Sequence, residues 1–216
     1  MFRRFVLALF FAPFFLLTAC SHDLSPQDVS IAGMVPALAF NMQDVNSGKP
    51  VSAADFLGKV TLLYFGYTNC PDVCPATLYN VDRILRGLGP LAARVNFLFV
   101  TVDPDRDTPA VLAQYVGLFG PNITGLRGNP DQLFSLARRY RVVFSVTKPS
   151  GTTPYQVTHS SAIYVFDAKG QAQFLIAGLD TAKPDIPGIT SDLRQVILSQ
   201  APVSWLERLL NLISSG

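Results

Sequence analysis

The sequence has few charged residues and little net charge. Charged side chains occupy only 15% of the 216 positions, and the formal net charge is +2. Nucleic-acid-binding proteins depend on clustered lysine and arginine, so this composition argues against a nucleic-acid partner. The sequence contains no internal repeat and no low-complexity segment, which excludes a repeat array. The length suits one domain of ordinary size with appendages, large enough to fold without disulfides.

Cysteine and histidine are also scarce, with three and two copies. Cys20 lies near the N-terminus, which leaves Cys70 and Cys74 as a close pair. One histidine, His22, stands beside Cys20, so His159 is the single histidine in the remainder of the chain. In an exported compartment the cysteine pair forms a disulfide unless a partner reduces it or a metal ion holds it.

Residues 1–19 have the pattern of an export signal. Arg3 and Arg4 precede an apolar stretch, residues 5–17, that is short for a membrane-spanning helix. The segment ends in Leu17-Thr18-Ala19-Cys20, which resembles the lipobox of bacterial lipoproteins. The resemblance implies cleavage before Cys20 and lipidation of its thiol. We therefore expect an exported lipoprotein, anchored in a membrane and facing the periplasm or extracytoplasmic space. A plain secretory signal or an uncleaved anchor is the alternative.

Three further segments follow from composition. Residues 20–35 mix Ser, Pro, Gln, Asp and Gly and are interpreted as a tether, with an ordered N-terminal strand as the alternative. Residues 36–200 alternate apolar runs with turn signals and form the predicted domain. Residues 201–216 have an apolar face at helical spacing and are expected to form an amphipathic C-terminal tail, which docks on the domain or contacts lipid or a partner.

Cys70 and Cys74 lie between an apolar run, residues 60–65, and a helical pattern that begins at Pro75. This order predicts a turn between a strand and a helix, where loops on a rigid scaffold commonly carry chemistry. Proline suits the first helical position, so Cys74 is predicted to be the helix N-cap. A thiol there meets the positive end of the helix dipole, which lowers its pKa. Three chemistries fit the pair: a redox couple, a soft-metal site or a structural disulfide.

The order of expected elements defines the fold class. It begins with a hairpin around a turn at 46–49 and then alternates strands and helices. An antiparallel hairpin over 162–176 and a last helix capped by Ser191 complete the domain. Crossovers by helices imply parallel central strands, whereas the closing hairpin adds antiparallel ones. The sequence therefore predicts an α/β, thioredoxin-like fold, with a mixed central sheet flanked by helices, an N-terminal hairpin and a C-terminal antiparallel hairpin.

The spacing of the pair is CxxxC, which can close a disulfide or turn both sulfurs to one ion. Two thiolates suit a soft ion such as Cu(I), and a third, imidazole ligand would also admit Cu(II). His159 is the candidate, because thioredoxin-like topology brings the loop before the closing hairpin beside the cysteine turn. A surface or core histidine without chemical function is the alternative.

Three segments resemble the signatures of the Sco/SenC copper proteins. They are Tyr67 to Pro75, Val102 to Pro109 and Thr158 to Ala162. The resemblance implies one copper ion per chain, Cu(I) or Cu(II), bound by Cys70, Cys74 and His159. It also implies a metallochaperone that delivers copper to the CuA centre of cytochrome c oxidase, with the CuA-bearing subunit as partner.

The sequence departs from the family pattern at two places. Asn69 stands where many members have histidine, but it is not a ligand position. A lipid anchor at Cys20 replaces the membrane helix that many members carry.

An acidic cluster follows the second predicted strand. Asp103, Asp105 and Asp107 accompany Arg106. They either orient the copper loop or face the acceptor protein, or they serve only as turn and cap residues before a helix capped by Thr108. No carboxylate is assigned as a ligand, because carboxylate matches Cu(I) poorly.

The alternative function is a thiol-disulfide oxidoreductase that reduces acceptor cysteines outside the cytoplasm and cycles through a Cys70–Cys74 disulfide. Thioredoxins suggest Cys70 as the attacking thiol, whereas the helix dipole suggests Cys74. A peroxiredoxin-like peroxidase fits poorly, because Thr68 lies two residues before Cys70 where that family has a threonine three before.

Overall fold

The computed structural model describes residues 24–150, 152 and 154–200. The predicted signal segment, Cys20 and the tail at 201–216 lie outside these residues. The strands are β1 (Asp28–Ser30), β2 (Asn41–Asp44), β3 (Pro50–Ser52), β4 (Val60–Gly66), β5 (Val95–Thr101), β6 (Ile123–Arg127), β7 (Phe144–Thr147), β8 (Gln156–His159), β9 (Ile163–Phe166) and β10 (Ala172–Ile176). The helices are α1 (Val73–Leu88), α2 (Pro109–Gly117), α3 (Pro130–Arg139) and α4 (Ile186–Ser199), with short 3-10 turns at Ala53–Phe56 and Gly89–Arg94. Within the described part of the chain, no helix has the length and apolar character to span a membrane.

Eight strands form one mixed sheet in the order β1-β10-β9-β4-β5-β6-β2-β3. The central strands β4, β5 and β6 run parallel, whereas β9, β10 and the β2–β3 hairpin pair antiparallel. β4 is buried along its whole length, as its continuous apolar sequence predicts for a central strand. The predicted α/β, thioredoxin-like architecture with both hairpins is confirmed.

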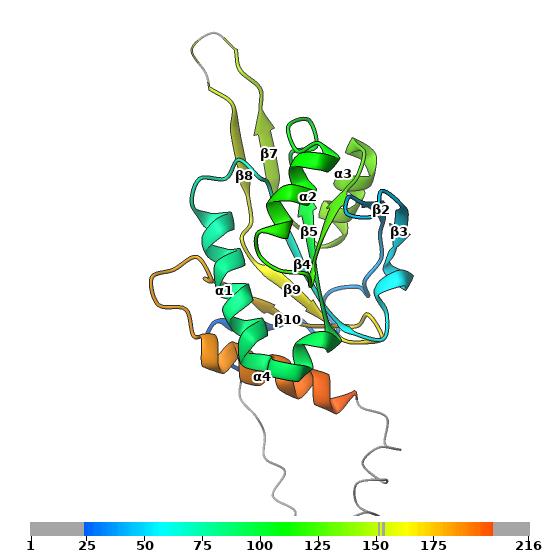
Figure 1. Ribbon diagram of the computed structural model, residues 1–216, viewed down its shortest axis with the longest axis vertical. Helices are drawn as coiled ribbons and strands as arrows, with labels where there is room; N and C mark the ends of the chain where they lie inside the picture. The colour runs from blue at the N-terminus through cyan, green and yellow to red at the C-terminus, as the bar shows by residue number, and fades with distance from the viewer. Residues whose placement is uncertain (1–23, 151, 153, 201–216) are drawn as a thin grey trace, which may run out of the picture.

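Helices cover both faces of this sheet. The crossovers β4-α1-β5 and β5-α2-β6 advance in the same direction, so the right-handed rule places α1 and α2 on one face. α4 packs beside α1 on that face (Figure 1). On the other face Tyr140, which follows α3, packs its ring against Tyr164 and Phe166 of β9. Leu63 of β4 lies opposite Tyr164 in the sheet, so the two side chains share the face that Tyr140 covers. Successive side chains of a strand point to opposite faces, so Tyr64 faces α1.

The N-terminal segment joins the sheet earlier than expected. Asp28–Ser30 pair antiparallel with β10 as an edge strand, so the tether prediction is wrong from residue 28 onward and the alternative, an ordered N-terminal strand, is correct there. Polar contacts hold this segment in place: the backbone N–H of Ser25 donates to Asp192 at 2.7 Å, and its hydroxyl donates to Asp185 at 2.8 Å. The polar composition of this segment predicted a tether. In the fold, polar groups such as those of Ser25 instead hold an edge strand in place.

The last helix also begins earlier than the sequence analysis expected. Ser191 lies inside α4, and Asp185 caps the helix by accepting a hydrogen bond from the backbone N–H of Gly188 at 3.0 Å. From its prolines and glycine, the stretch 180–190 is predicted to be a connecting segment, and Pro187 belongs to that stretch. It instead lies in the first turn, where the missing N–H of proline costs no hydrogen bond.

The strands β7 and β8 form a separate two-stranded sheet that projects from the top of the molecule (Figure 1). Phe144 of β7 lies directly opposite His159 of β8 in this ladder. The polar composition of residues 147–158 predicts a loop or an exposed hairpin, and the structure shows that this stretch contributes to a hairpin arm. His159 therefore lies at the base of a projecting arm, next to the main sheet.

Candidate metal centre

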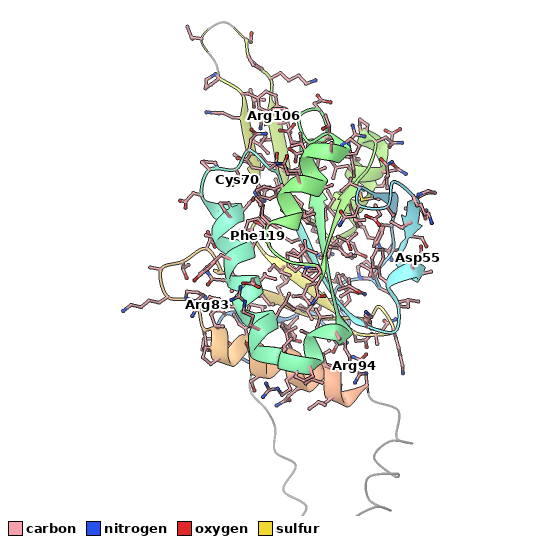
Figure 2. The ribbon with its side chains drawn as sticks, viewed as in Figure 1. Asp55, Cys70, Arg83, Arg94, Arg106 and Phe119 are labelled. Carbon is pink, nitrogen blue, oxygen red and sulfur yellow. The ribbon has the colours of Figure 1, made fainter. Side chains whose placement is uncertain are left out.

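Cys70, Cys74 and His159 come together at the top of β4. One ligand atom from each residue can be chosen so that all three lie within 4.8 Å of one another. Cys70 belongs to the turn after β4, Cys74 to the first turn of α1, and His159 to the end of β8. Figure 2 shows Cys70 beside the upper end of α1, with Arg106 above it near the hairpin. The three side chains grouped by the sequence analysis are thus neighbours in the fold.

The helix that carries Cys74 starts before that residue. Asp72 occupies the N-cap position, so Cys74 is the second residue of α1 and the N-cap prediction is wrong. Proline is tolerated at Pro75 because the N–H groups of the first helical turn have no partner within the helix.

The expected low pKa of Cys74 is also wrong. Burial raises the pKa of the Cys74 thiol to about 12, although a hydrogen bond from Tyr64 acts in the opposite direction. Cys74 is fully buried, and desolvation of its charged form outweighs the helix dipole. Without a metal ion, Cys74 is therefore a neutral thiol at physiological pH.

The orientation of His159 is fixed by one backbone carbonyl. Nδ1 of His159 lies 2.9 Å from the carbonyl oxygen of Ser160. That oxygen only accepts hydrogen bonds, so Nδ1 carries the proton. Burial lowers the pKa of His159, which keeps the ring neutral and leaves a lone pair on Nε2. Nε2 lies 3.4 Å from Cys74 Sγ, so its lone pair is directed at the sulfur pair.

Both sulfurs accept hydrogen bonds from neighbouring groups. The backbone N–H of Cys74 donates to Cys70 Sγ at 3.4 Å, and the Tyr64 hydroxyl donates to Cys74 Sγ at 3.5 Å. Cys70 as a whole residue is half-buried, whereas Cys74 is fully buried, so the loop at Cys70 is the more accessible side of the centre. This exposure favours Cys70 as the attacking thiol in any disulfide exchange, and it opens one side of the centre to a partner.

Two tyrosine rings enclose the imidazole of His159. Tyr64 and Tyr67 meet it edge-on, with ring centroids 6.0 and 5.6 Å away. Tyr67 therefore forms a wall of the site. The contacts of Tyr64 had not been predicted. Its alternation with Leu63 along a buried strand is the only sequence signal that places it on the α1 side.

The residues in and next to the acidic cluster have different roles. Asp107 is fully buried and accepts hydrogen bonds from the backbone and hydroxyl of Thr68, two residues before Cys70. Burial raises the pKa of Asp107, although hydrogen bonds from Thr101 and Thr68 partly offset this. Thr108 caps α2 as predicted, accepting from the N–H of Val111 at 3.4 Å. Orientation of the cysteine loop and helix capping are therefore both present, on different residues.

The other two aspartates contact the β7–β8 arm. Asp103 accepts hydrogen bonds from Arg106 Nε and from the Tyr155 hydroxyl, each at 2.5 Å. The Arg106 guanidinium stacks 3.8 Å from the centre of the Tyr155 ring. The exposed Asp105 pairs with Lys148 at 2.7 Å. The contacts of Asp103 fasten the arm that carries His159 to the loop after β5, whereas the exposed ion pair of Asp105 contributes little.

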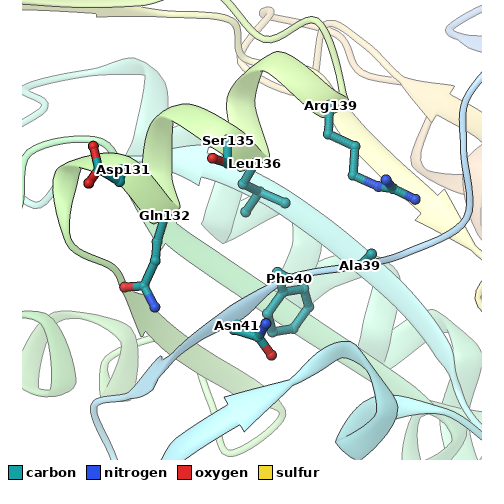
Figure 3. A pocket seen from close by; sticks show the side chains of 8 residues that line it. All are labelled: Ala39, Phe40, Asn41, Asp131, Gln132, Ser135, Leu136 and Arg139. Atoms are coloured by element: carbon teal, nitrogen blue, oxygen red, sulfur yellow. The ribbon is translucent and has the colours of Figure 1, made fainter.

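A second depression in the surface lies away from this centre. A groove of about 480 Å³ lies between α3 and residues 39–41, and Figure 3 shows the side chains that line it. Arg139 lies at one end, and its guanidinium donates to the carbonyl oxygen of Ala37. The groove includes none of the three grouped side chains, and its arginine is engaged with the backbone. It is therefore not the candidate site.

Two thiols and one neutral imidazole suit a soft or borderline metal ion. The protein thus combines a thioredoxin-like fold with a Cys-Cys-His group at the carboxyl end of a central parallel strand. Residues 37–196 match the family model described as SCO1/SenC, and the chain belongs to the SCO1/SenC family.

Named relatives agree with this assignment. The chain is 41% identical to the mitochondrial Protein SCO2 homolog of Bos taurus over 133 residues, which cover 61% of this chain and 50% of that protein. It is 38% identical to the mitochondrial Protein SCO1 of Saccharomyces cerevisiae over 139 residues, covering 61% and 45%. The chain spans about half the length of these curated relatives.

Two solved structures resemble the fold closely. Bradyrhizobium japonicum ScoI with copper bound is 34% identical, with a TM-score of 0.63 over 74% of this chain and 98% of that one. Yeast Sco1 with copper bound is 32% identical, with a TM-score of 0.66 over 79% of this chain and 93% of that one. Both similarities cover most of the described domain.

Proposed function

We propose that this protein is a metallochaperone that binds one copper ion through Cys70, Cys74 and His159 and passes it to an acceptor protein. The observation that carries the proposal is the convergence of two sulfurs and one nitrogen within 4.8 Å. Two relatives of known structure, ScoI and yeast Sco1, are described with copper bound. Thiolate sulfur is a preferred ligand of Cu(I), and imidazole extends the set to Cu(II).

The site has features that suit transfer rather than permanent storage. Cys70 is half-buried and lies on a turn, so an incoming ligand can reach the ion from that side. Copper then moves by ligand exchange, in which a cysteine or histidine of the acceptor replaces one ligand at a time. We infer that the acceptor is the CuA-bearing subunit of cytochrome c oxidase, whose copper ligands are of this type. Lipidation of Cys20 would keep the protein at the membrane beside such an acceptor.

The protein's own groups prepare the ligands. Ser160 holds the imidazole with Nε2 free of a proton, so His159 can bind without losing one. Cys74 must release its proton when the ion enters, because burial raises its pKa to about 12. Binding of copper is therefore coupled to release of the Cys74 proton, and return of that proton favours release of the ion.

A second candidate function, thiol-disulfide exchange, is favoured by the unequal exposure of the two free thiols. Cys70 would attack an acceptor disulfide as thiolate, forming a mixed disulfide and expelling one acceptor thiolate. Cys74 would then attack Cys70, releasing the second acceptor thiol and leaving a Cys70–Cys74 disulfide. The acceptor gains the two electrons that this pair loses. A Cys74→Ser variant would trap the mixed disulfide, and no adduct with either single-cysteine variant would count against this role.

The deciding experiment is an anaerobic copper titration of the full-length chain in detergent, with Cys20→Ser so that two thiols remain. We expect one copper per chain and a thiolate-to-Cu(II) absorption band. His159→Ala and Cys70→Ser should each weaken binding and abolish or displace the band. A reduced chain that takes up no stoichiometric copper, yet exchanges disulfides with an acceptor peptide, would favour the oxidoreductase instead. Unchanged copper affinity and absorption in His159→Ala would remove His159 from the ligand set.

A further inference from the structure

The hydrogen bonds around the metal centre have one consistent direction. Ser160 accepts from Nδ1 of His159, so Nε2 must accept from its own neighbour, the Cys74 sulfur at 3.4 Å. With the Cys74 thiol hydrogen directed at Nε2, the sulfur lone pairs accept from the Tyr64 hydroxyl at 3.5 Å. The three hydrogen bonds therefore form a chain in which Tyr64 donates to Cys74, Cys74 donates to His159, and His159 donates to the carbonyl oxygen of Ser160.

Tyr64 occupies a position from which it reaches both Cys74 and His159. It is fully buried in β4, its hydroxyl contacts Cys74 Sγ, and its ring packs edge-on against His159 at 6.0 Å. Burial raises the pKa of Tyr64 far above its ordinary value, so its hydroxyl keeps its proton and stays a donor. This donor remains available when the Cys74 proton has been replaced by a metal ion.

We propose that Tyr64 is a positioning residue of the copper site, whose hydroxyl donates a hydrogen bond to Cys74 Sγ and shifts the preference of the site toward Cu(I). This inference rests on the proposed copper function. A hydrogen bond to a thiolate withdraws electron density from the sulfur and makes it a poorer donor. Cu(II) depends more strongly than Cu(I) on electron donation from thiolate, so the bond weakens the oxidised complex more.

The direct test is Tyr64→Phe in the full-length Cys20→Ser chain. This change keeps the ring that packs on His159 and removes only the donor. We expect one copper per chain to remain. The thiolate-to-Cu(II) band should move to longer wavelength, because the sulfur orbitals rise in energy. The ratio of Cu(II) affinity to Cu(I) affinity should increase by about threefold to tenfold, the range expected for one hydrogen bond.

Tyr164→Phe is the matched control. It also removes a buried tyrosine hydroxyl, one that donates to the carbonyl oxygen of Tyr140 at 2.7 Å on the opposite face of the sheet. We expect a loss of thermal stability with no movement of the absorption band and no change in the affinity ratio. A general loosening of the core would affect both variants, whereas a specific effect on the sulfur appears only at position 64.

A second substitution keeps the test valid if the phenylalanine variant does not fold. 3-Fluorotyrosine incorporated at position 64 is a stronger donor of nearly the same size, and it should move the band to shorter wavelength. An unmoved band and affinity ratio in a chain that still binds one copper would overturn the role of Tyr64 and leave the copper function intact. Failure of the unsubstituted chain to bind copper would overturn both.

Discussion

Asp107 accepts two hydrogen bonds from Thr68, one from its backbone N–H at 3.0 Å and one from its hydroxyl at 2.6 Å. A third comes from the Thr101 hydroxyl at 2.5 Å. One buried carboxylate thus connects the end of β5 to the loop that presents Cys70. The position of the first cysteine therefore depends on a side chain that does not touch the metal centre.

Asp107→Ala should loosen the cysteine loop and destabilise the fold. The substitution leaves three donors without a partner. The Thr101 hydroxyl is fully buried and costs about 1–3 kcal/mol, whereas the two donors of the partly buried Thr68 cost less. We expect a total loss of about 2–4 kcal/mol in denaturant unfolding, and a loss of about tenfold in copper affinity because the loop is less well held. Asp105→Ala is the control: its exposed pair with Lys148 should leave both quantities unchanged. Equal effects at the two positions would contradict the loop-holding role of Asp107.

The buried carboxyl group of Asp28 should make the free energy of unfolding decrease as the pH rises. Burial, followed by the neighbouring carboxyl groups of Asp192 and Asp185, raises the pKa of Asp28 from 3.8 to about 8. Between these values the folded protein holds a proton that the unfolded chain has released, so stability falls from about pH 4 to pH 8. Asp28→Asn should flatten this slope and stabilise the protein at pH 8 by about 1–3 kcal/mol.

The measurement for Asp28 is thermal unfolding of both forms across this pH interval. Asp55→Asn serves as a comparison, because hydrogen bonds from Ser52 lower the pKa of Asp55. Asp55 therefore contributes stability that is present at neutral pH and is lost as the solution becomes acidic. A stability difference between wild type and Asp28→Asn that stays constant from pH 4 to pH 8 would disprove the assignment.

Gly66→Ala should disturb the floor of the metal centre. A methyl group at this position would lie 2.7 Å from the ring of Phe99 and 2.9 Å from the ring of Tyr64. Both rings are buried, so we expect a loss of about 1–3 kcal/mol on unfolding and a weaker copper complex. Gly117→Ala has open space around it near the end of α2 and should be neutral or slightly stabilising. Equal free energies of unfolding in the Gly66→Ala and Gly117→Ala variants would contradict this prediction. They would mean that the rings of Phe99 and Tyr64 move aside for the new methyl group without cost.

Copper affinity should increase with pH over the neutral range. Cys74 must release a proton on binding, and its pKa of about 12 lies well above neutrality. This one thiol therefore contributes about a tenfold rise in affinity for each pH unit. His159 adds little, because burial lowers its pKa and the ring is already neutral. Competition titrations between pH 6 and pH 8 measure the slope, and an affinity independent of pH would mean that Cys74 is not a ligand in the thiolate form.

Much of the fold was predictable because its signals are local. The buried runs of β4 and β5, the capped starts of α2 and α3, and the turn at 46–49 each act within a few residues of the chain. The start of α4 was not predictable, because Pro187 favours both a helix start and a chain break, and packing against α1 decides between them. The sequence could not decide between a tether and an ordered strand at β1, because an edge strand of three residues carries almost no periodic pattern.

The grouping of the three candidate side chains was predictable from the sequence, but their surroundings were not. CxxxC and a single histidine in the domain are visible in the sequence. Their electrostatics depend on which groups the fold packs around them, so the raised pKa of Cys74 could not be derived from its place near a helix start. The hydroxyl of Tyr64 likewise reaches Cys74 only after the α1 crossover places the helix over β4.

His159 and Cys74 lie 85 residues apart along the chain, and the arm that ends at His159 forms a sheet of its own. An ion bound by both residues acts as a removable cross-link between this arm and the main sheet. The coupling is reciprocal. A bound ion stabilises the contact between the arm and the main sheet by the same free energy by which that contact strengthens binding of the ion. Handing over the ion therefore also releases a mechanical constraint. The contacts that Asp103 and Arg106 make at the base of the arm do not involve the ion, so they keep His159 near the two cysteines in a donor that has released its metal.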